Sequence, residues 1–346
     1  MRKSAMKKLK VVQIGIGHAH ATSAFNSLLR QPELFEVVGF AVPESEEVEF
    51  ADRVKEYRDD RGIKKYTIEE ALNLPDVEGA VIETKEVNLT KYAIMAAEKG
   101  LHIHMDKPGG FELSEFEKLI GIVKEKKLAF SIGYMYRFNP KILEALEKIE
   151  NGDIGEVYSV EAQMNCEHKW EERQEWLSVF PGGMMFYLGC HLVDLIYRIM
   201  GEPDEVIPLN CSGGFDGVTS EDFGMAVFKY KHGVSFAKTC AFECGGYMRR
   251  QLVICGTKGT FELKPLEAFE PTAERDYLYT EMREVYKGQG WQYAGGHSNS
   301  GYFNRFDAMM QNYAEVALGL KENPFTYDYE LGLYKLLMKA CGKETK

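Results

Sequence analysis

The sequence predicts an α/β protein in two parts, with a parallel sheet first and a mostly antiparallel sheet second. Near the N-terminus a β-rich run leads into two glycines and a helix-forming segment. Strands and helices then alternate at short spacing up to about residue 134, which is typical of βαβ units and a parallel sheet. Beyond residue 140 long alternating strands dominate, which favours antiparallel pairing.

The first strand, turn and helix have the order of a dinucleotide-binding unit. Leu9–Ile14 is followed by Gly15 and Gly17, and residues 21–29 have helix-forming composition. Gly15 permits a tight turn, Gly17 leaves room for a pyrophosphate, and the helix N-terminus presents free N–H groups to it. His20 stands where the third glycine of the motif is expected, so it either points outward or widens the helix–strand packing. The alternative is an ordinary glycine-rich βα turn without a ligand.

The rest of the first part continues the alternation. Thr67, Asn88 and Ser114 are predicted to cap helices, and Gly100 to end one. The expected strands are 35–42, 77–83, 102–105 and 129–133, and the expected helices are 46–57, 68–72, 89–99 and 114–126.

The second part begins after Asn139-Pro140. Its expected strands are 155–166, 221–230, 233–242, 249–255 and 260–263, and its expected helices are 141–150, 184–200, 302–320 and 329–341. Residues 267–300 have no clear period. The predicted domains are therefore 1–135 and 136–346. In this arrangement the C-terminal helix can pack against the first domain.

Composition excludes several classes of protein. With 346 residues and 45% hydrophobic content, the chain can bury one large or two ordinary cores. A net charge of −11 argues against nucleic acid or an anionic membrane as a partner. The 7 cysteines are scattered without a C-x-x-C pair, which indicates reduced thiols and predicts no metal site. Neither a signal peptide nor a membrane-length apolar run is found, so we expect a cytoplasmic protein.

Three further motifs are candidates for chemistry. Lys107 and Pro108 follow the strand 102–105, at the sheet edge where α/β folds bind ligands. Tyr187, His191 and Asp194 share one face of an otherwise apolar predicted helix. That histidine is either an acid/base group with its orienting partner or a buried histidine satisfied by Asp194 or Tyr187.

The third motif, residues 134–140, contains Tyr136 and Arg137 and leads into the second domain. Its alternative interpretation is a hinge segment held by aromatic packing.

Together these motifs resemble the glucose–fructose oxidoreductase/inositol dehydrogenase (Gfo/Idh/MocA) family. The order G-x-G, K-P, R-F-N-P and GG…L-G-x-H-x-x-D extends over nearly the whole chain. The resemblance implies a Rossmann domain followed by an α/β domain with an open, mostly antiparallel sheet. It also implies homodimers or homotetramers formed through that sheet, and hydride transfer between NAD(P) and a carbon of a sugar, polyol or related small molecule.

The resemblance assigns the chemistry to two residues. His191 would take the hydroxyl proton of the substrate while Lys107 polarises the same oxygen. Asp194 would support the histidine without taking part in the reaction. Tyr187 stands where the family usually has an aspartate, so it either shares the proton transfer or marks a different reaction.

The expected cofactor is NAD(H) rather than NADP(H). The ribose-binding acid of the family maps to Pro43, so Glu44 is the candidate for the ribose hydroxyl, and the acidic run 44–49 should repel a 2′-phosphate. Lys85 is a candidate for contact with phosphate or nicotinamide, or else a solvated lysine. The predicted cofactor-binding residues are Gly15, Gly17, His18, His20, Glu44, Lys85, Lys107 and Pro108.

The predicted substrate is carbohydrate-like. Trp rings offer apolar faces to sugar C–H groups, and Arg and His offer hydrogen bonds to hydroxyls. The candidates are Tyr136, Arg137, His168, Trp170, Arg173, Trp176 and His191, with His297 and Asn299 as further ones. A surface loop without a ligand is the alternative for 168–176.

Two other functions stay open at this point. One is a glycosidase that uses bound NAD for transient oxidation and elimination. The other is a regulator that keeps the nucleotide site but catalyses no reaction. The departures from the family pattern at Pro43 and Tyr187 suggest this alternative.

Overall fold

The computed structural model describes residues 7–269, 276–288 and 293–343. Contacts divide the chain into two compact units. Unit 1 comprises residues 1–134 and 306–332, and unit 2 comprises residues 135–305 and 333–346. The last helix, α11 (Tyr327–Ala340), contains the boundary between residues 332 and 333.

Within residues 7–134, unit 1 holds a six-stranded sheet in the order β3-β2-β1-β4-β5-β6. Every pairing is parallel, as predicted. The strand order reverses between β1 and β4, which is the arrangement of a Rossmann fold and the place where such sheets bind ligands. The strands are β1 (Leu9–Ile14), β2 (Phe35–Ala41), β3 (Lys65–Tyr66), β4 (Gly79–Ile82), β5 (His102–Met105) and β6 (Phe130–Ile132).

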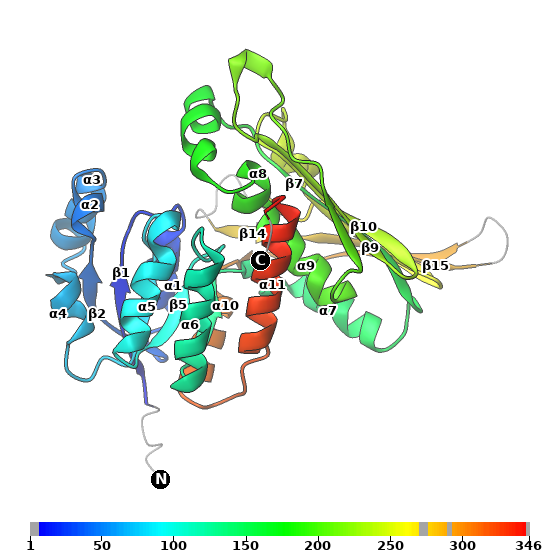
Figure 1. Cartoon of the computed structure of the whole chain (residues 1–346). Helices are drawn as coiled ribbons and strands as arrows, with labels where there is room; N and C mark the ends of the chain where they lie inside the picture. Colours follow the sequence, from blue (N-terminus) through cyan, green and yellow to red (C-terminus); the bar gives the residue numbers. More distant parts are fainter. Residues whose placement is uncertain (1–6, 270–275, 289–292, 344–346) are drawn as a thin grey trace, which may run out of the picture. The chain divides into compact units, whose positions relative to one another are not determined.

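Helices cover both faces of this sheet. Helices α1 (Ala21–Arg30) and α10 (Asp307–Ala317) pack together on one face, and α5 (Leu89–Glu98) and α6 (Leu113–Glu125) on the other (Figure 1). Tyr313 of α10 donates its hydroxyl to the carbonyl of His102, 3.0 Å away. Residues 306–332 therefore complete the layer that covers the first sheet.

The helix caps of unit 1 were predictable only where both partners are local. Thr67 forms the predicted capping box, because its hydroxyl accepts from the Glu70 amide at 3.1 Å and Glu70 accepts from the Thr67 amide at 2.9 Å. The predicted cap at Asn88 is wrong, because its side chain accepts no hydrogen bond from α5; its Nδ2 donates to Glu46 at 2.7 Å. The predicted cap at Ser114 is also wrong, because α6 begins one residue earlier.

The single helix expected over 46–57 is wrong as well. The segment is divided into α2 (Glu44–Glu47), α3 (Ala51–Lys55) and a π-helical turn (Glu56–Asp60), with a turn over 48–50. Glu46 is buried within this segment and accepts hydrogen bonds from the Lys85 amide and from Asn88. The short helix α4 (Ile68–Leu72) follows.

The described part of unit 2 holds an eight-stranded sheet in the order β16-β15-β12-β11-β7-β10-β9-β8. All pairs are antiparallel except β7–β10, so the mostly antiparallel prediction is confirmed. The strands are β7 (Val157–Asn165), β8 (Glu205–Pro208), β9 (Phe223–Tyr230), β10 (Gly233–Cys240), β11 (Gln251–Gly256), β12 (Gly259–Leu263), β15 (Glu281–Lys287) and β16 (Tyr293–Asn299).

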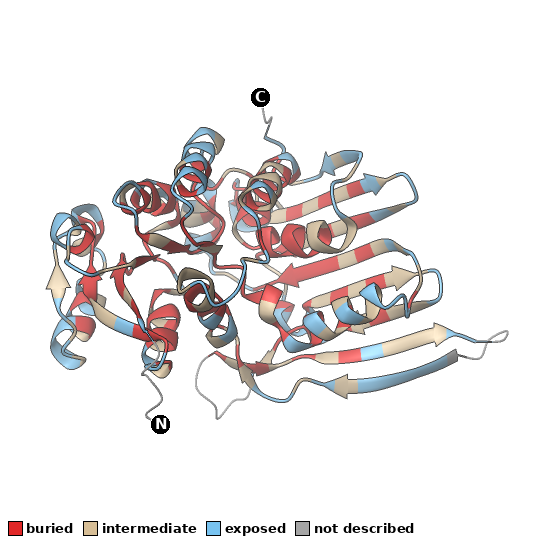
Figure 2. Cartoon of the chain, turned by 90° about the horizontal axis from the view of Figure 1, so that it is seen from below, coloured by how far each residue is buried: buried red, intermediate tan, exposed pale blue. Residues whose placement is uncertain are grey.

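Buried and partly exposed residues alternate along most of β9, β10, β11 and β12 (Figure 2). Helix α9 (Gly189–Met200) packs on β7 and β10. The opposite face presents a partly exposed row in register, formed by Val227, Phe236, Glu161 and Val253. Helix α7 (Pro140–Glu150) contacts β12.

Strands also form where the sequence has no clear period, between residues 267 and 300. Besides β15 and β16, this stretch contains β13 (Ala268–Phe269) and β14 (Tyr277–Tyr279), which join β17 (Phe303–Asn304) in a small sheet. The glycines at 295 and 296 break the hydrophobic alternation of β16. Its pairing with β15, rather than its own composition, makes it a strand.

The single helix expected over 184–200 is wrong. It is divided at Leu188 into α8 (Gly183–Tyr187) and α9. Gly189 permits this arrangement, because a Cβ there would lie 2.5 Å from Sδ of Met185. Tyr187 therefore precedes the break, whereas His191 and Asp194 follow it.

Two further findings concern the whole described chain. The cysteines at 166, 190, 211, 240, 244, 255 and 341 all lie in described residues, and none is disulfide-bonded. Among residues 7–269, 276–288 and 293–343, no helix combines the length and the apolar character that a bilayer crossing requires.

The buried His104 on β5 should make the protein sensitive to acid. Its Nδ1 lies 3.2 Å from Oγ of Ser131, and burial lowers its pKa to about 4. In an unfolded chain the pKa is about 6.5, so between these values the unfolded state binds a proton that the folded state does not. Stability should therefore fall by roughly 3 kcal/mol as the pH drops through this window.

Urea unfolding at about pH 7 and about pH 4.5 measures this loss. His104→Gln should reduce it, and the exposed His232→Gln should leave it unchanged. His20, whose pKa is lowered to about 3, contributes to the same slope, so a part remains in the variant. Equal slopes in the wild type and His104→Gln would contradict the assignment.

Candidate functional site

The turn after β1 leaves no room for a side chain at either glycine. Gly15 has a φ of +88°, and a Cβ there would lie 2.4 Å from the amide nitrogen of Thr84. A Cβ on Gly17 would lie 2.6 Å from Oε2 of Glu46. No acidic residue lies in the first turn of α1, all of which is described. With the strand reversal beside it, this helix N-terminus fits the pyrophosphate of a dinucleotide.

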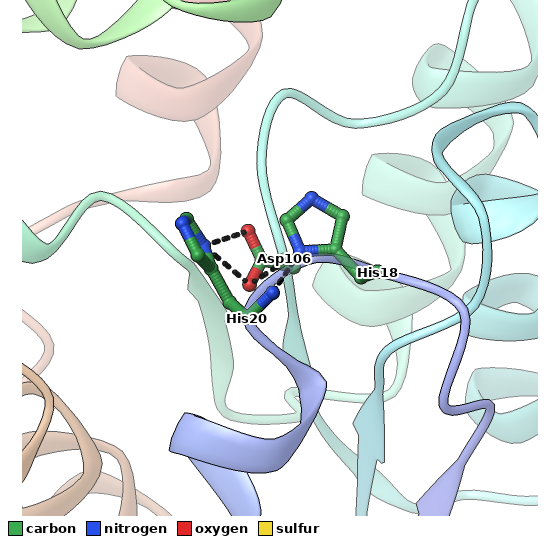
Figure 3. A group of neighbouring side chains, drawn as sticks. All are labelled: His18, His20 and Asp106. Carbon is green, nitrogen blue, oxygen red and sulfur yellow. Dashed lines mark hydrogen bonds and ion pairs between the residues drawn. The ribbon is translucent and has the colours of Figure 1, made fainter. Parts of the chain in front are cut away.

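The two histidines of the turn converge on Asp106, at the end of β5 (Figure 3). Oδ2 of Asp106 lies 3.2 Å from Nδ1 of His18 and 3.1 Å from Nδ1 of His20. The His20 amide also donates to Nδ1 of His18, at 3.2 Å. His20 does not point outward, since its ring also stands edge-on to Phe306 with centroids 5.4 Å apart.

Burial and charge set the ionisation of this group. Burial alone raises the pKa of Asp106, but His18 and His20 hold it well below its usual range. Burial lowers the pKa of His20 to about 3 despite the neighbouring carboxylate. Burial and the charge of Asp106 raise the pKa of Glu83 well above its usual range.

Lys107, the residue after Asp106, is hydrogen-bonded to the Asp106 side chain. It follows β5 and is 1% exposed. Oδ1 of Asp106 accepts a hydrogen bond from the Lys107 amide at 2.6 Å. The predicted lysine therefore lies at the carboxyl end of the parallel sheet, in the same buried group as His20.

The predicted ribose-binding acid, Glu44, and the nearby Glu46 lie in different environments. Glu44 is exposed at the start of α2, whereas Glu46 is buried against the glycine turn. Lys85 is partly exposed, and its ammonium pairs with Glu49 at 2.9 Å. Sequence reasoning missed Glu46, because nothing in the acidic run 44–49 distinguishes it.

In unit 2, Asp194 pairs with Arg137. Nη2 of Arg137 lies 2.8 Å from Oδ1 of Asp194, and its Nε lies 2.9 Å from the same oxygen. Both side chains are at most 2% exposed. Arg198 donates to the carbonyl of Arg137 at 3.1 Å. Asp194 thus fixes the short helical turn Met135–Phe138 to α9.

This turn places Tyr136 against His191. The two rings are edge-on with centroids 4.9 Å apart, and His191 is 2% exposed. The Tyr136 hydroxyl interacts with Glu267, which Arg250 and Arg305 hold in place. Burial and the charge of Glu267 raise the pKa of Tyr136 well above its usual range. The sequence gives no signal for Glu267, which lies in the stretch without a clear period.

Tyr187 lies in an aromatic cluster. Its ring centroid is 4.3 Å from that of Trp176, 5.6 Å from that of Phe180 and 6.4 Å from that of His168. Three predicted site residues, Tyr187, Trp176 and His168, are therefore brought together.

The other predicted substrate residues of the loop are tied to acidic partners or to backbone. Arg173 is buried and pairs with Asp216 at 2.6 Å and Asp222 at 3.4 Å. Trp170 is 42% exposed and donates its indole N–H to the carbonyl of Asp216. His297, on β16, lies 3.1 Å from Glu281.

Removal of one partner of the buried Arg137–Asp194 pair should strongly destabilise the fold. Asp194→Ala leaves the guanidinium without its carboxylate and should cost about 3–5 kcal/mol of unfolding free energy. The double variant Arg137→Met/Asp194→Leu should recover most of this loss, because no buried charge remains.

Urea unfolding followed by tryptophan fluorescence measures both effects. The control is Glu202→Ala, which removes an exposed pair with Lys339 at 3.4 Å and should change stability by less than about 1 kcal/mol. A loss in Asp194→Ala no larger than in this control would contradict the assignment.

Comparisons with known proteins agree with this architecture. Residues 9–134 match the model of the oxidoreductase family with an NAD-binding Rossmann fold, and residues 142–262 match the GFO/IDH/MocA C-terminal domain. The aldose-aldose oxidoreductase of Caulobacter crescentus, solved with glycerol, has a TM-score of 0.75 at 19% identity over 96% of each chain. At that identity the likeness concerns the fold alone.

Curated relatives match over shorter stretches. The uncharacterized oxidoreductase YhhX of Escherichia coli is 31% identical over 139 residues, 40% of each chain. D-xylose 1-dehydrogenase (NADP(+)) 2 of Haloferax volcanii is 26% identical over 196 residues, 55% of this chain and 58% of the relative. The matches span 40%, 56% and 62% of the lengths of three such relatives. With both family models matched in order along the sequence, the chain belongs to the Gfo/Idh/MocA oxidoreductase family.

Proposed function

We propose that the protein is an NAD(P)-dependent oxidoreductase that transfers hydride to or from a carbon of a sugar, polyol or sugar-derived substrate. The observation that carries this proposal is the link between Lys107 and the nucleotide-binding turn. Asp106 accepts from the Lys107 amide and lies 3.1 Å from His20 of the turn. A buried cation is thereby fixed beside the expected cofactor site.

The substrate class rests on two further observations. One matched relative is named as a D-xylose dehydrogenase. In unit 2, Trp176 and Tyr187 bring two aromatic rings together with His168, and such rings provide apolar faces for sugar C–H groups. Both observations favour a carbohydrate-like ligand.

In the proposed reaction Lys107 donates a hydrogen bond to the reacting oxygen of the substrate. His191 accepts the hydroxyl proton during oxidation and returns it during reduction. NAD(P), when bound, supplies the hydride acceptor or donor. The Tyr136 ring and the Arg137–Asp194 pair are positioning groups, because they fix the environment of the imidazole without reaching the reacting atoms.

Substitution of the two proposed catalytic residues tests the function directly. Lys107→Met and His191→Ala should each lower kcat by about 10²-fold or more, because general acid–base groups contribute about that factor. The double variant should lose little more than either single variant, since residues that serve one step are not additive.

The assay is NAD(H) absorbance with a panel of aldoses and polyols. His232→Ala, exposed on the β9–β10 hairpin, is the control and should retain full turnover. NADH binding, measured by its fluorescence, should persist in His191→Ala. Full turnover in both single variants would refute the catalytic roles, and absence of dinucleotide binding in the wild type would refute the function.

We also propose that the enzyme prefers NAD(H) over NADP(H). Glu44 is exposed at the start of α2, three residues after the end of β2, and the acidic first turn of α2 disfavours the extra phosphate. Lys85, the nearby candidate cation, is already paired with Glu49. Glu44 is therefore the proposed ligand of the ribose hydroxyls.

Dissociation constants for NADH and NADPH test this preference. Glu44→Gln should weaken NADH by about tenfold, equal to about 1.4 kcal/mol, while leaving NADPH unchanged or tighter. Glu47→Gln, on the same helix and paired with Lys65, is the matched control. Tighter NADPH binding in the wild type would overturn the assignment and direct attention to Lys85.

Self-association through the C-terminal sheet stays a prediction. The partly exposed row of Val227, Phe236 and Val253 on its open face is compatible with such an interface.

A further inference from the structure

We propose that His18, His20 and Asp106 bind a divalent transition-metal ion. The scattered cysteines predict no metal site, but the fold brings two imidazoles and a carboxylate together at the glycine turn of unit 1 (Figure 3). The site lies entirely within this unit. It does not depend on the proposed hydride transfer.

The spacing of the donor atoms fits a metal. Zinc bonds of about 2.0–2.2 Å in a tetrahedron place neighbouring donors roughly 3.3–3.6 Å apart, close to the separations found here. Oδ2 of Asp106 lies 3.2 Å from Nδ1 of His18 and 3.1 Å from Nδ1 of His20. One donor atom from each of the three residues lies within 4.8 Å of the others.

Glu83 is the candidate fourth ligand. It follows β4, is fully buried, and its Oε2 lies 3.8 Å from Nδ1 of His18. Among the described residues, neither carboxylate oxygen of Glu83 has a hydrogen-bond partner, nor does the buried Nε2 of His18. Buried polar atoms without partners are costly, and a bound ion would satisfy the carboxylate.

The formal charges of the surroundings also favour a cation. Glu83, Glu86 and Asp106 carry carboxylates, and Oε1 of Glu86 lies 3.6 Å from Nε2 of His18. The ammonium of Lys107 acts on His20 and Glu83 and offsets one of these charges. If the ion displaces the proton of Glu83 and both imidazoles are neutral, a divalent charge balances the two carboxylates that remain.

The ligand types select the class of metal. Imidazole nitrogens suit zinc, iron, cobalt, nickel and copper, whereas magnesium and calcium prefer oxygen ligands. One contact must change on binding, because Nδ1 of His18 also accepts from the His20 amide. A small rotation of that ring would turn its lone pair from the amide to the ion.

The test is titration of the chelator-treated, full-length protein with zinc chloride, followed by calorimetry and by metal analysis after dialysis. The wild type should retain one zinc per chain and should not bind magnesium chloride. His20→Ala and Asp106→Asn should each weaken zinc binding by more than about tenfold. His102→Ala, at the other end of β5, is the matched control and should bind as the wild type does.

Thermal unfolding provides an independent measurement. Zinc should raise the Tm of the wild type and of His102→Ala, and should have little effect on His20→Ala. A wild type without zinc affinity would overturn the proposal, and so would unchanged affinity in both ligand variants. NADH titrations of the same samples keep the two hypotheses distinct, because loss of the metal site with intact NADH binding leaves the proposed function standing.

Discussion

The carboxylate of Asp106 is the point at which the separate segments of unit 1 meet. It contacts both histidines of the glycine turn and accepts the amide of Lys107, and it is 1% exposed. A buried charge without such partners would be strongly unfavourable. The turn after β1 and the end of β5 must therefore keep their present separation, which places Lys107 beside the nucleotide-binding turn.

In unit 2, buried and paired charges likewise fix the residues around His191. The buried Arg137–Asp194 pair fixes the turn that carries Tyr136, and Glu267, held by two arginines, receives the Tyr136 hydroxyl. Two hydrophobic residues in place of Arg137 and Asp194 could stabilise the fold equally well. What they would not supply is a fixed direction for the tyrosine ring, which the carboxylate gives by contacting both Nε and Nη2 of Arg137.

Local patterns were enough to predict most of the fold. Alternation and helical periodicity depend on neighbouring residues, so the parallel and the mostly antiparallel type of the two main sheets and the Thr67 cap could be predicted from the sequence. Strands β3, β8, β15 and β16 could not. The errors arose where a distant partner decides the outcome. The side chain of Asn88 contacts the distant Glu46 and caps no helix, and β16 is a strand because β15 pairs with it. The same distinction holds for the site, since Lys107 and His191 follow from motifs but Glu46, Glu83 and Glu267 do not.

His20 illustrates how a departure from a motif changes what a turn can bind. A glycine at this position would leave only backbone amides facing a phosphate. The imidazole instead reaches Asp106 and packs against Phe306, so the turn is tied to β5 and to the segment before α10. Backbone amides bind anions, whereas two imidazoles with a carboxylate bind cations. A turn with both sets of groups offers backbone amides to an anion and side-chain donors to a cation, whereas a third glycine would offer only the amides.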